Sequence, residues 1–208
     1  MPLRSTEQPQ ISVETTQMRV TDLLRIAIVS GELAPGEDLR QEELAAYYQV
    51  SRIPIRAALR QLEAEGFVKT NQHGKASVVE LDTEEVLEIF EIRKALELLA
   101  LQKAFPYMDD NSFEKDPYKW GESNKEFHLA LFRRANSPRL LMMIANLHDQ
   151  GGRYFKLKGV LDHYKKRSEI EHQGILDACR ERNLDAAMKL LSGHLGDCRS
   201  AALDCLSI

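Results

Sequence analysis

The sequence predicts a mostly α-helical protein, in which an N-terminal winged helix-turn-helix precedes an all-α helical bundle. Two observations support this fold class. Residues 31–80 contain two short helix patterns, which are separated by a tight break and followed by a hairpin pattern. From residue 83 onward, apolar residues recur at helical spacing almost throughout, and the strand pattern ends. We therefore expect two domains, covering residues 1–81 and 82–208.

The N-terminal domain is expected to contain three helices and a two-stranded hairpin. These elements are predicted at residues 14–30, 41–48, 52–65, 67–70 and 77–81. Ser51 is a favourable N-cap for the third helix, because its hydroxyl can accept a hydrogen bond from a free backbone N–H. Pro54 falls in the first turn of that helix, where a missing N–H costs little. The connection between the strands, residues 71–75, is expected to form the tip of the wing.

The C-terminal domain is expected to be a bundle of helices. They are predicted at about residues 83–105, 117–135, 138–158, 162–181 and 184–206. Asp82 with Glu85 has the pattern of a capping box at the start of the first helix, and Asn183 is expected to cap the last. The apolar stripe that the first helix is expected to bury consists of Val86, Ile89, Phe90, Leu96 and Leu99.

The charge balance limits how this protein could bind nucleic acid. Its formal net charge is −4 and its sequence pI is about 5.9, so it is not a general polyanion binder. Residues 1–80 contain nine basic and eleven acidic side chains. The predicted third helix, however, carries arginine at every fourth position, namely Arg52, Arg56 and Arg60. Alone, such a stripe is equally typical of a solvated helix face, but the surrounding turn and wing favour DNA binding.

The position of these arginines indicates which of them would read DNA. In a helix-turn-helix, the N-terminal part of the second helix contacts base edges. Arg52 and Arg56 are therefore the candidates for base or phosphate contact, since arginine can pair bidentately with guanine. Arg40 precedes the motif and could hold the DNA backbone, and Gly74 at the wing tip permits a close approach. The predicted DNA-binding residues are Arg40, Ser51, Arg52, Pro54, Arg56, Arg60, His73, Gly74 and Lys75.

These residues occur in a pattern that resembles the DNA-binding domain of the GntR family of bacterial transcription regulators. The matching segments are Gly31-x-x-x-Pro35-Gly36, Glu43-Leu44-Ala45, Val50-Ser51-Arg52-x-Pro54-x-Arg56-x-Ala58-Leu59 and Leu62-x-x-Glu65-Gly66. The resemblance covers about residues 15–80 and implies that Arg52, Arg56 and the wing tip contact DNA. Some members have an arginine where this chain has Glu42, so a contact made there would be absent or moved to Arg40.

Three histidines of the C-terminal domain lie on three different predicted helices: His128, His172 and His194. Helical bundles build metal sites from side chains on facing helices, and three imidazoles with one oxygen ligand suit zinc or nickel. Asn124 lies four residues before His128, on the same helix face, and is the expected oxygen ligand. The alternative is that each histidine is a hydrogen-bonded core residue. His148 and His163 fit no such group and are expected at the surface or at helix ends.

This domain resembles the ligand-binding domain, named FCD, of the FadR-type subgroup of the GntR family, over about residues 84–200. The residues that carry the resemblance are Asn124-Lys125-Glu126-Phe127-His128, His172 and His194. It implies a cavity between helices that holds a divalent metal and binds a small organic acid. The subgroup has aspartate in place of Asn124, so this ligand is neutral and weaker. Arg93 also matches, and it either pairs with the effector carboxylate or holds Glu97; Tyr154 is a further effector-binding candidate.

Together these patterns predict a ligand-responsive transcription regulator, expected to be a repressor and not an enzyme. One recognition helix reads too few bases for specificity, so we expect a homodimer on an inverted-repeat operator of double-stranded DNA. Two alternatives use the same histidines. One is a regulator that senses the metal itself, and the other is a metal-dependent hydrolase with a zinc-activated water.

The remaining features concern the cellular compartment. The cysteines Cys179, Cys198 and Cys205 are too sparse for a disulfide framework, and Cys198 and Cys205 are expected to pack on one helix face. The N-terminal residues lack the apolar segment of a signal peptide, and the longest apolar runs are too short to span a bilayer. A cytoplasmic protein with no membrane partner is therefore expected.

Overall fold

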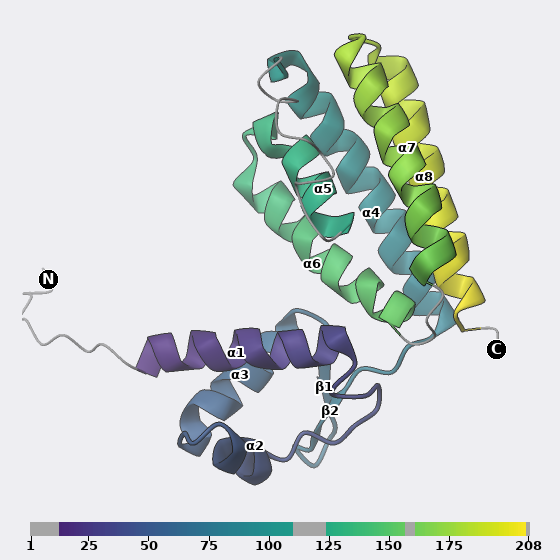
Figure 1. Ribbon diagram of the computed structural model, residues 1–208. Helices are drawn as coiled ribbons and strands as arrows, with labels where there is room; N and C mark the ends of the chain where they lie inside the picture. The colour runs from purple at the N-terminus through teal and green to yellow at the C-terminus, as the bar shows by residue number, and fades with distance from the viewer. Residues whose placement is uncertain (1–12, 110–123, 157–160, 207–208) are drawn as a thin grey trace, which may run out of the picture. The chain divides into compact units, whose positions relative to one another are not determined.

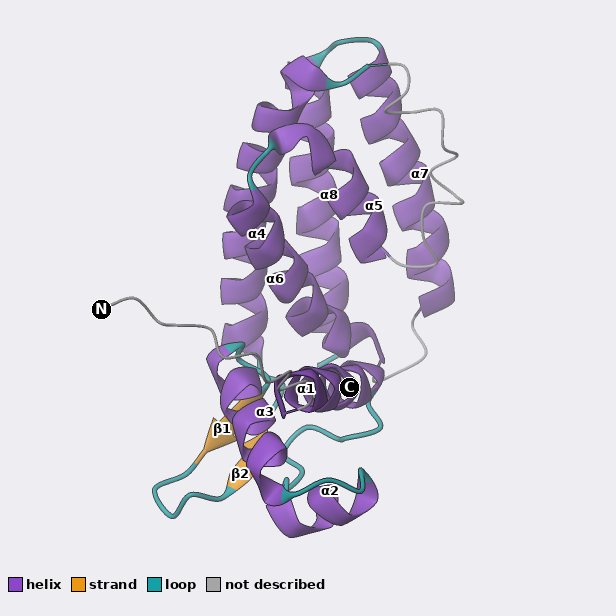
Figure 2. Cartoon of the chain, turned by 90° about the vertical axis from the view of Figure 1, so that its left-hand side faces the viewer, coloured by secondary structure: helices purple, strands orange, loops and turns teal. Residues whose placement is uncertain are grey.

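The computed structural model describes residues 13–109, 124–156 and 161–206. The chain divides into two compact units, Met1–Glu80 and Leu81–Ile208, so the division falls one residue before the expected one. In the described residues, strands occur in the first unit and the second unit is helical (Figure 2). The prediction of a mostly α-helical protein is thus confirmed. No helix within these described ranges is both long and apolar enough to cross a membrane.

The first unit combines three helices with a two-stranded antiparallel sheet. They are α1 (Val13–Ser30), α2 (Gln41–Tyr47), α3 (Arg52–Ala64), β1 (Val68–Thr70) and β2 (Ala76–Val78). Val68 pairs with Val78 in the sheet, and a bridge from Asp38 to Ser77 joins the segment before α2 to the hairpin. Helices α1 and α3 pack on one another over an apolar core that the sheet completes. Buried members of this core are Leu24, Ile55, Leu62, Phe67 and Val78.

The turn between the two strands is held by its own residues. The side-chain oxygen of Asn71 accepts hydrogen bonds from the backbone N–H of His73 (2.9 Å) and of Lys75 (3.0 Å). Gly74 has a φ of +75°, which L side chains rarely adopt, while a Cβ at this position would meet no atom within 4 Å. The backbone conformation, rather than a lack of space, therefore favours glycine at the wing tip.

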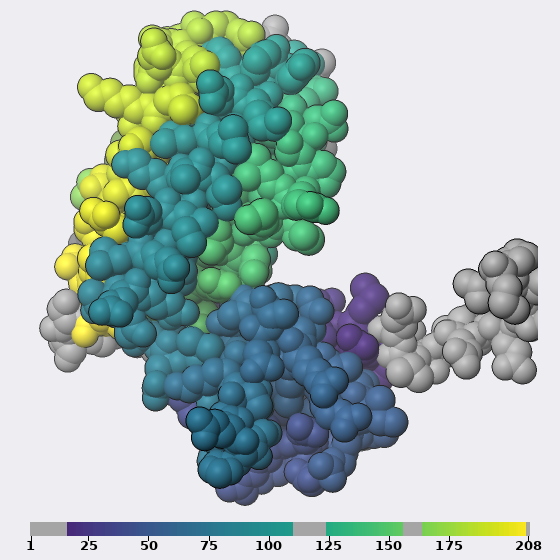
Figure 3. Space-filling model, turned by 180° about the vertical axis from the view of Figure 1, so that it is seen from behind, coloured from purple at the N-terminus to yellow at the C-terminus, as the bar shows by residue number. Residues whose placement is uncertain are grey.

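The second unit consists of helices packed around α4. Its elements are α4 (Thr83–Ala104), η1 (Phe105–Tyr107), α5 (Asn124–Leu131), η3 (Arg133–Ala135), α6 (Pro138–Lys156), α7 (Leu161–Arg180) and α8 (Leu184–Asp204), where η marks a 3₁₀ helix. Helix α4 contacts both α6 and α8, and α7 packs along α8 (Figure 1). In the space-filling view, α4 and α8 form adjoining parts of the surface of this unit (Figure 3).

Side-chain caps fix the starts of the first and last helices of this unit, as predicted. The carboxylate of Asp82 accepts a hydrogen bond from the backbone N–H of Glu85 at 2.8 Å. The side-chain oxygen of Asn183 accepts one from the backbone N–H of Ala186 at 3.0 Å. Each bond satisfies a backbone donor that has no partner inside the helix.

Helix α5 ends earlier than the sequence pattern indicated. The prediction was a helix at about residues 117–135, whereas the structure has a helix at Asn124–Leu131 and a 3₁₀ turn at Arg133–Ala135. Asn136 then adopts a left-handed conformation with a φ of 48°, which ends the segment before α6. Residues 117–123 lie outside the described part of the chain.

One prediction about the buried face of α4 was wrong. Leu99 was expected to face the core, but it is 46% exposed. The interior face carries Arg93 and Glu97 instead, which are 2% and 0% exposed. Because these two side chains form an ion pair, with Nε of the arginine 3.0 Å from the carboxylate, they can be buried together. This charged pair supports the site described below.

Candidate functional site

Helix α3 presents most of the predicted DNA-reading residues to solvent. Its core-facing residues are Ile55, Ala58, Leu59 and Leu62. Their packing turns the opposite face outward, and Arg52, Arg56 and Arg60 lie exposed on it. Ser51 occupies the N-cap position but makes no side-chain capping bond, in contrast to the expectation. Pro54 is buried in the first turn, so its side chain supports the helix instead of forming part of this surface.

Acidic residues of the same unit pair with the predicted DNA-binding cations. The guanidinium of Arg52 lies 2.9 Å from the carboxylate of Glu42, which comes from α2. The ammonium group of Lys75 lies 2.6 Å from the carboxylate of Asp38. All four side chains are exposed, and ion pairs of this kind contribute about 0–1 kcal/mol. DNA phosphates can therefore compete for both cations.

The other predicted contact residues of this unit are accessible as well. Arg40 is exposed, and its guanidinium lies 2.9 Å from the carboxylate of Glu43. At the wing tip, His73, Gly74 and Lys75 are all exposed. The arrangement thus has two exposed parts, a recognition helix with three arginines and a wing, which together are what a winged helix-turn-helix offers to a duplex.

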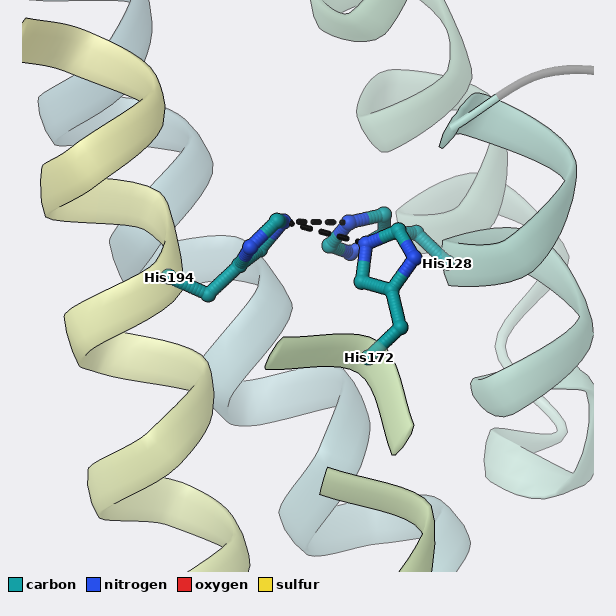
Figure 4. A group of neighbouring side chains, drawn as sticks. All are labelled: His128, His172 and His194. Atoms are coloured by element: carbon teal, nitrogen blue, oxygen red, sulfur yellow. Dashed lines mark hydrogen bonds between the residues drawn. The ribbon is translucent and has the colours of Figure 1, made fainter. Parts of the chain in front are cut away.

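The helical unit contains the second candidate site, where three histidines converge (Figure 4). His128 comes from α5, His172 from α7 and His194 from α8. The Nε2 atom of His194 lies 3.2 Å from Nε2 of His128 and 3.2 Å from Nε2 of His172. Ligand atoms of all three lie within 4.8 Å of one another. The structure therefore brings together the three histidines that the sequence singled out.

Two carboxylates orient two of these imidazoles, those of His128 and His194. Glu171 Oε2 lies 2.8 Å from Nδ1 of His194. Glu97 Oε2 lies 2.6 Å from Nδ1 of His128, within ion-pair distance, although the angle is not that of a hydrogen bond. Contacts on Nδ1 leave Nε2 of both rings facing the centre of the group. A carboxylate behind a histidine in this way fixes the ring and raises its basicity as a metal ligand.

The protonation preferences of the three histidines differ. Burial lowers the pKa of His128 to about 4, despite the attraction of Glu97. Burial and the neighbouring histidines also lower the pKa of His172. Burial acts in the same direction on His194, but its contacts with Cys198 and Glu171 outweigh it and raise the pKa to about 9. His128 and His172 are thus neutral near pH 7, the form that binds metals.

The donor atoms fit a divalent metal ion. In a tetrahedral zinc site, with Zn–N bonds of about 2.0–2.1 Å, two ligand nitrogens lie about 3.3 Å apart. The two Nε2–Nε2 separations of 3.2 Å match this value. Phe127 stacks on the ring of His172, with 3.7 Å between the ring centroids, and thereby helps to hold its orientation.

Asn124, the predicted oxygen ligand, lies beside this group. Its side-chain oxygen is 3.5 Å from the hydroxyl of Ser168, and that hydroxyl is 3.4 Å from Nε2 of His172. The amide oxygen thus contacts the serine hydroxyl at the edge of the histidine group.

A second set of possible ligands, Glu97, His128 and His148, lies next to the first. The guanidinium of Arg93 makes it unfavourable for a cation, because Nη2 lies 3.0 Å from Nε2 of His148 and Nε lies 3.0 Å from Glu97 Oε1. The expectation that His148 lies at the surface or a helix end was wrong, since it is 5% exposed. Of His163, only the backbone in α7 is described.

Sequence reasoning missed the roles of Glu171 and His148 in this network. A signal for His148 was present, because it lies four residues after the buried Ile144 and three before the buried Gly151 on α6. This spacing places His148 on the buried face of α6, although its side chain is polar. Glu171 immediately precedes His172 in the sequence and faces the next helix, a relationship that spacing along one chain does not reveal.

The two predicted effector-binding residues have partners within the protein. Arg93 makes the second of its two expected contacts, the ion pair with Glu97, and its guanidinium also lies over the ring of Phe90 at 4.9 Å. The hydroxyl of Tyr154 donates a hydrogen bond to Glu85 at 2.5 Å, which joins α6 to the start of α4. Both side chains therefore already have partners within the protein. An effector would bind them either alongside these partners or in place of them.

Comparisons with known proteins agree with the two units. The family model for bacterial regulatory proteins of the gntR family matches residues 16–79, and the model for the FCD domain matches residues 88–197. The HTH-type transcriptional regulator YdhC of Bacillus subtilis is 28% identical over 192 residues, covering 84% of this chain and 86% of YdhC.

Two further relatives span nearly the whole chain. The gluconate operon transcriptional repressor of Bacillus licheniformis is 26% identical, covering 93% of this chain and 88% of the repressor. The solved structure of McbR/YncC from E. coli has the same fold, with a TM-score of 0.73 and 21% identity, covering 94% of this chain and 99% of that one. The chain therefore belongs to the GntR family of transcriptional regulators, in the group whose members carry a C-terminal FCD domain, and it is not an enzyme.

Proposed function

We propose that this regulator is a repressor that binds an inverted-repeat operator as a homodimer and senses a small organic acid through a metal held by the histidine group. The observation that carries the proposal is the convergence of three Nε2 atoms from α5, α7 and α8, in a chain that also has an exposed recognition helix. We further propose that it acts in the cytoplasm, without a membrane partner.

The DNA-binding part of the proposal rests on α3 and the wing. Arg52 and Arg56 lie near the N-terminus of the exposed face of α3, where a recognition helix reads base edges. Arg40, Arg60 and Lys75 are expected to contact phosphates, which gives affinity without sequence preference. A pair of such units on an inverted repeat supplies the specificity that one unit lacks. The relative named a gluconate operon repressor supports repression as the mode of action.

In the sensing part, His128, His172 and His194 would hold a divalent ion, zinc or nickel. Asn124, whose side-chain oxygen contacts Ser168, would be a further donor. The ion supplies a Lewis-acidic centre to which a carboxylate can bind. Glu97 and Glu171 orient the ligand imidazoles from behind, and Arg93 neutralises Glu97 within the core. An organic acid is thus recognised by its carboxylate.

Regulation requires that the acid binds the DNA-free state and the DNA-bound state with different affinities. For a repressor, the acid favours the DNA-free state. A tenfold difference in affinity corresponds to about 1.4 kcal/mol of coupling. By reciprocity, operator DNA then weakens binding of the acid by the same factor.

The test is a titration of the metal-loaded protein against short inverted repeats and random duplexes at physiological salt. Inverted repeats selected from a random library should bind at least about a thousandfold more tightly than random DNA. A small carboxylic acid that stabilises the protein should lower that affinity. Equal affinity for selected and random duplexes contradicts the operator part of the proposal.

The metal itself could be the signal, because the same donor atoms serve either role. A chelator separates the two possibilities. If the metal is the signal, its removal changes operator affinity in the absence of any acid. If the acid is the signal, metal removal abolishes only the response to the acid.

A further inference from the structure

The first turn of α3 exposes a large apolar side chain, that of Ile53. Its exposed fraction is 63%, although it stands between the charged Arg52 and the buried Pro54. Sequence reasoning placed Pro54 on the DNA-binding surface and passed over Ile53. The burial of the two side chains reverses this assignment, because Pro54 supports the helix from inside and Ile53 faces solvent.

Ile53 occupies the middle of the outward face of α3. Successive residues of an α-helix are rotated by about 100° around its axis. On this basis, about 180° from Ile53 lies the centre of the core-facing residues, which are Ile55, Ala58, Leu59 and Leu62. Arg56 and Arg60 come three and seven residues after Ile53, a spacing that keeps them on its face. Ile53 and these two arginines thus form one outward stripe.

We propose that Ile53 determines part of the operator sequence, by contacting the 5-methyl group of one thymine in each half-site. The inference rests on the proposed binding to an inverted repeat and adds a base identity to it. In a helix-turn-helix, the N-terminal residues of the recognition helix contact base edges in the major groove. Ile53 is the second residue of α3, so its side chain belongs to the turn that makes these contacts.

Thymine is the base whose major-groove edge suits an apolar side chain. Its methyl group is apolar, whereas the base edges otherwise present hydrogen-bond donors and acceptors in that groove. The side chain of Ile53 has no polar atom, so it would remove water from such groups without replacing the lost hydrogen bonds. A T·A pair is therefore favoured opposite Ile53, and pairs that lack the methyl group are disfavoured.

The neighbouring arginines recognise other features of DNA. Arg52 and Arg56 can each pair with guanine through two hydrogen bonds, and any arginine can bind phosphate whatever the sequence. The contact of Ile53 with a methyl group involves no charge, so it does not add to the salt dependence of binding. Its contribution can therefore be measured separately from that of the arginines.

Single exposed apolar residues are common on protein surfaces, so exposure alone does not identify a contact residue. Ile53 is distinguished by its place, in the first turn of the recognition helix and among exposed arginines. Ile26 of α1 has the same exposed fraction, 63%, but lies outside the recognition helix and the wing. It therefore provides a matched control for the loss of an exposed isoleucine.

The test replaces thymine by uracil, which removes the methyl group and keeps the hydrogen-bonding groups of the base. An inverted repeat is first selected from a random library with the full-length native protein. Its thymines are then replaced in both half-sites together, one position at a time. At one position, binding should weaken by about 15-fold, since each of the two buried methyl groups corresponds to about fourfold.

The Ile53→Ala variant should bind the thymine operator at least about tenfold more weakly, and it should no longer distinguish thymine from uracil at that position. The slope of log affinity against log salt concentration should stay the same, because no phosphate contact is lost. The variant should fold normally, since the side chain is exposed. Ile26→Ala should keep the affinity of the native protein and its response to uracil.

Two results would overturn the inference while selective operator binding stands. One is native binding that is insensitive to uracil at every thymine of the half-site, which includes a selected half-site without thymine. This result depends on no variant. The other is a response to uracil that persists in Ile53→Ala. If selection yields no preferred duplex, operator binding itself is refuted and the inference fails with it.

Discussion

The two candidate sites differ in whether their charged side chains are exposed or buried. On α3 and the wing, the cations are exposed and pair with acidic neighbours such as Glu42 and Asp38. In the helical unit, Arg93, Glu97 and His148 are at most 5% exposed and contact one another. An exposed pair contributes about 0–1 kcal/mol, whereas removing one member of a buried pair costs about 3–5 kcal/mol.

This difference suits the two tasks. A surface that binds DNA must exchange its partners easily, so weak pairs are an advantage. A site that holds a metal must keep its ligands in place before the metal arrives, so a buried network is an advantage. The variants below test whether the exposed ion pairs of the DNA-binding surface contribute less to stability than the buried network of the helical unit does.

The largest effect is expected from Glu97→Gln. The substitution leaves the buried guanidinium of Arg93 without its counter-charge, so the free energy of unfolding should fall by about 3–5 kcal/mol. Urea unfolding followed by circular dichroism measures it. The exposed Glu91 of the same helix is the matched control, and Glu91→Gln should change stability by no more than about 0.5 kcal/mol. Similar small losses of stability in both variants would show that the buried ion pair contributes no more to stability than an exposed charge does.

Removal of a metal ligand should have the next largest effect. Loss of a residue that only orients a metal ligand weakens metal binding by up to about 100-fold. Loss of a ligand itself should cost more, so His172→Ala should reduce zinc affinity by more than about 100-fold. The operator affinity of the metal-free protein should not change. Competition with a chromophoric chelator measures the affinity. Asp149 is partly buried and pairs with Lys125 outside the histidine group, so Asp149→Asn is a control that should retain zinc. Unchanged zinc affinity in His172→Ala would remove this histidine from the ligand set.

Acid should destabilise the helical unit through its buried histidines. Burial, with Arg93 alongside, lowers the pKa of His148 to about 3 from an unfolded value of about 6.5. Between these pH values the unfolded chain binds the proton and the folded chain resists it, so stability falls as the pH falls.

One such group contributes up to about 1.4 kcal/mol per pH unit. His148→Gln should therefore flatten the dependence of unfolding free energy on pH below 6.5, measured by urea titrations of the metal-free protein. His73 is exposed on the wing, and His73→Gln is the control that should leave the slope unchanged. An equally steep slope in His148→Gln would place the proton uptake elsewhere.

For the recognition helix, Arg56→Ala should weaken operator binding by about 1–3 kcal/mol and leave unfolding free energy nearly unchanged. The arginine is exposed, so its removal opens no cavity. Fluorescence anisotropy with a labelled operator measures the loss. Arg139, exposed on α6 of the helical unit, provides the control variant Arg139→Ala. Equal operator affinity in both variants would exclude Arg56 from the contact surface.

The smallest effect is expected from Glu42→Gln. Without the carboxylate, Arg52 loses an exposed partner and becomes more available to phosphate, so affinity for random DNA should rise by less than about 1 kcal/mol. The slope of log affinity against log salt concentration should become steeper by no more than the contribution of about one additional phosphate contact. Glu63→Gln, farther along α3, is the comparison variant. A fall in affinity for random DNA would indicate that Glu42 positions Arg52 instead of competing for it.

More of the DNA-binding surface than of the histidine site could be predicted from the sequence. The helix-turn-helix was predictable because local signals agree, from the arginines at every fourth position to the glycine at the wing tip. The three histidines were identifiable by their motif and by lying on separate helices. Their supporting carboxylates were not, because an Arg93–Glu97 spacing of four is equally typical of an exposed helical pair. Only tertiary packing makes that pair buried.

The central claim is that the histidine group is a metal-dependent effector site, and metal analysis combined with thermal unfolding tests it most directly. Elemental analysis of the purified protein is followed by a thermal-shift screen of small carboxylic acids, with and without chelator. Ligands that bind only the folded state raise its apparent stability by mass action. We predict one metal ion per chain and an acid that stabilises the protein only when the metal is present. No bound metal, even after incubation with zinc, and no metal-dependent response would contradict the claim.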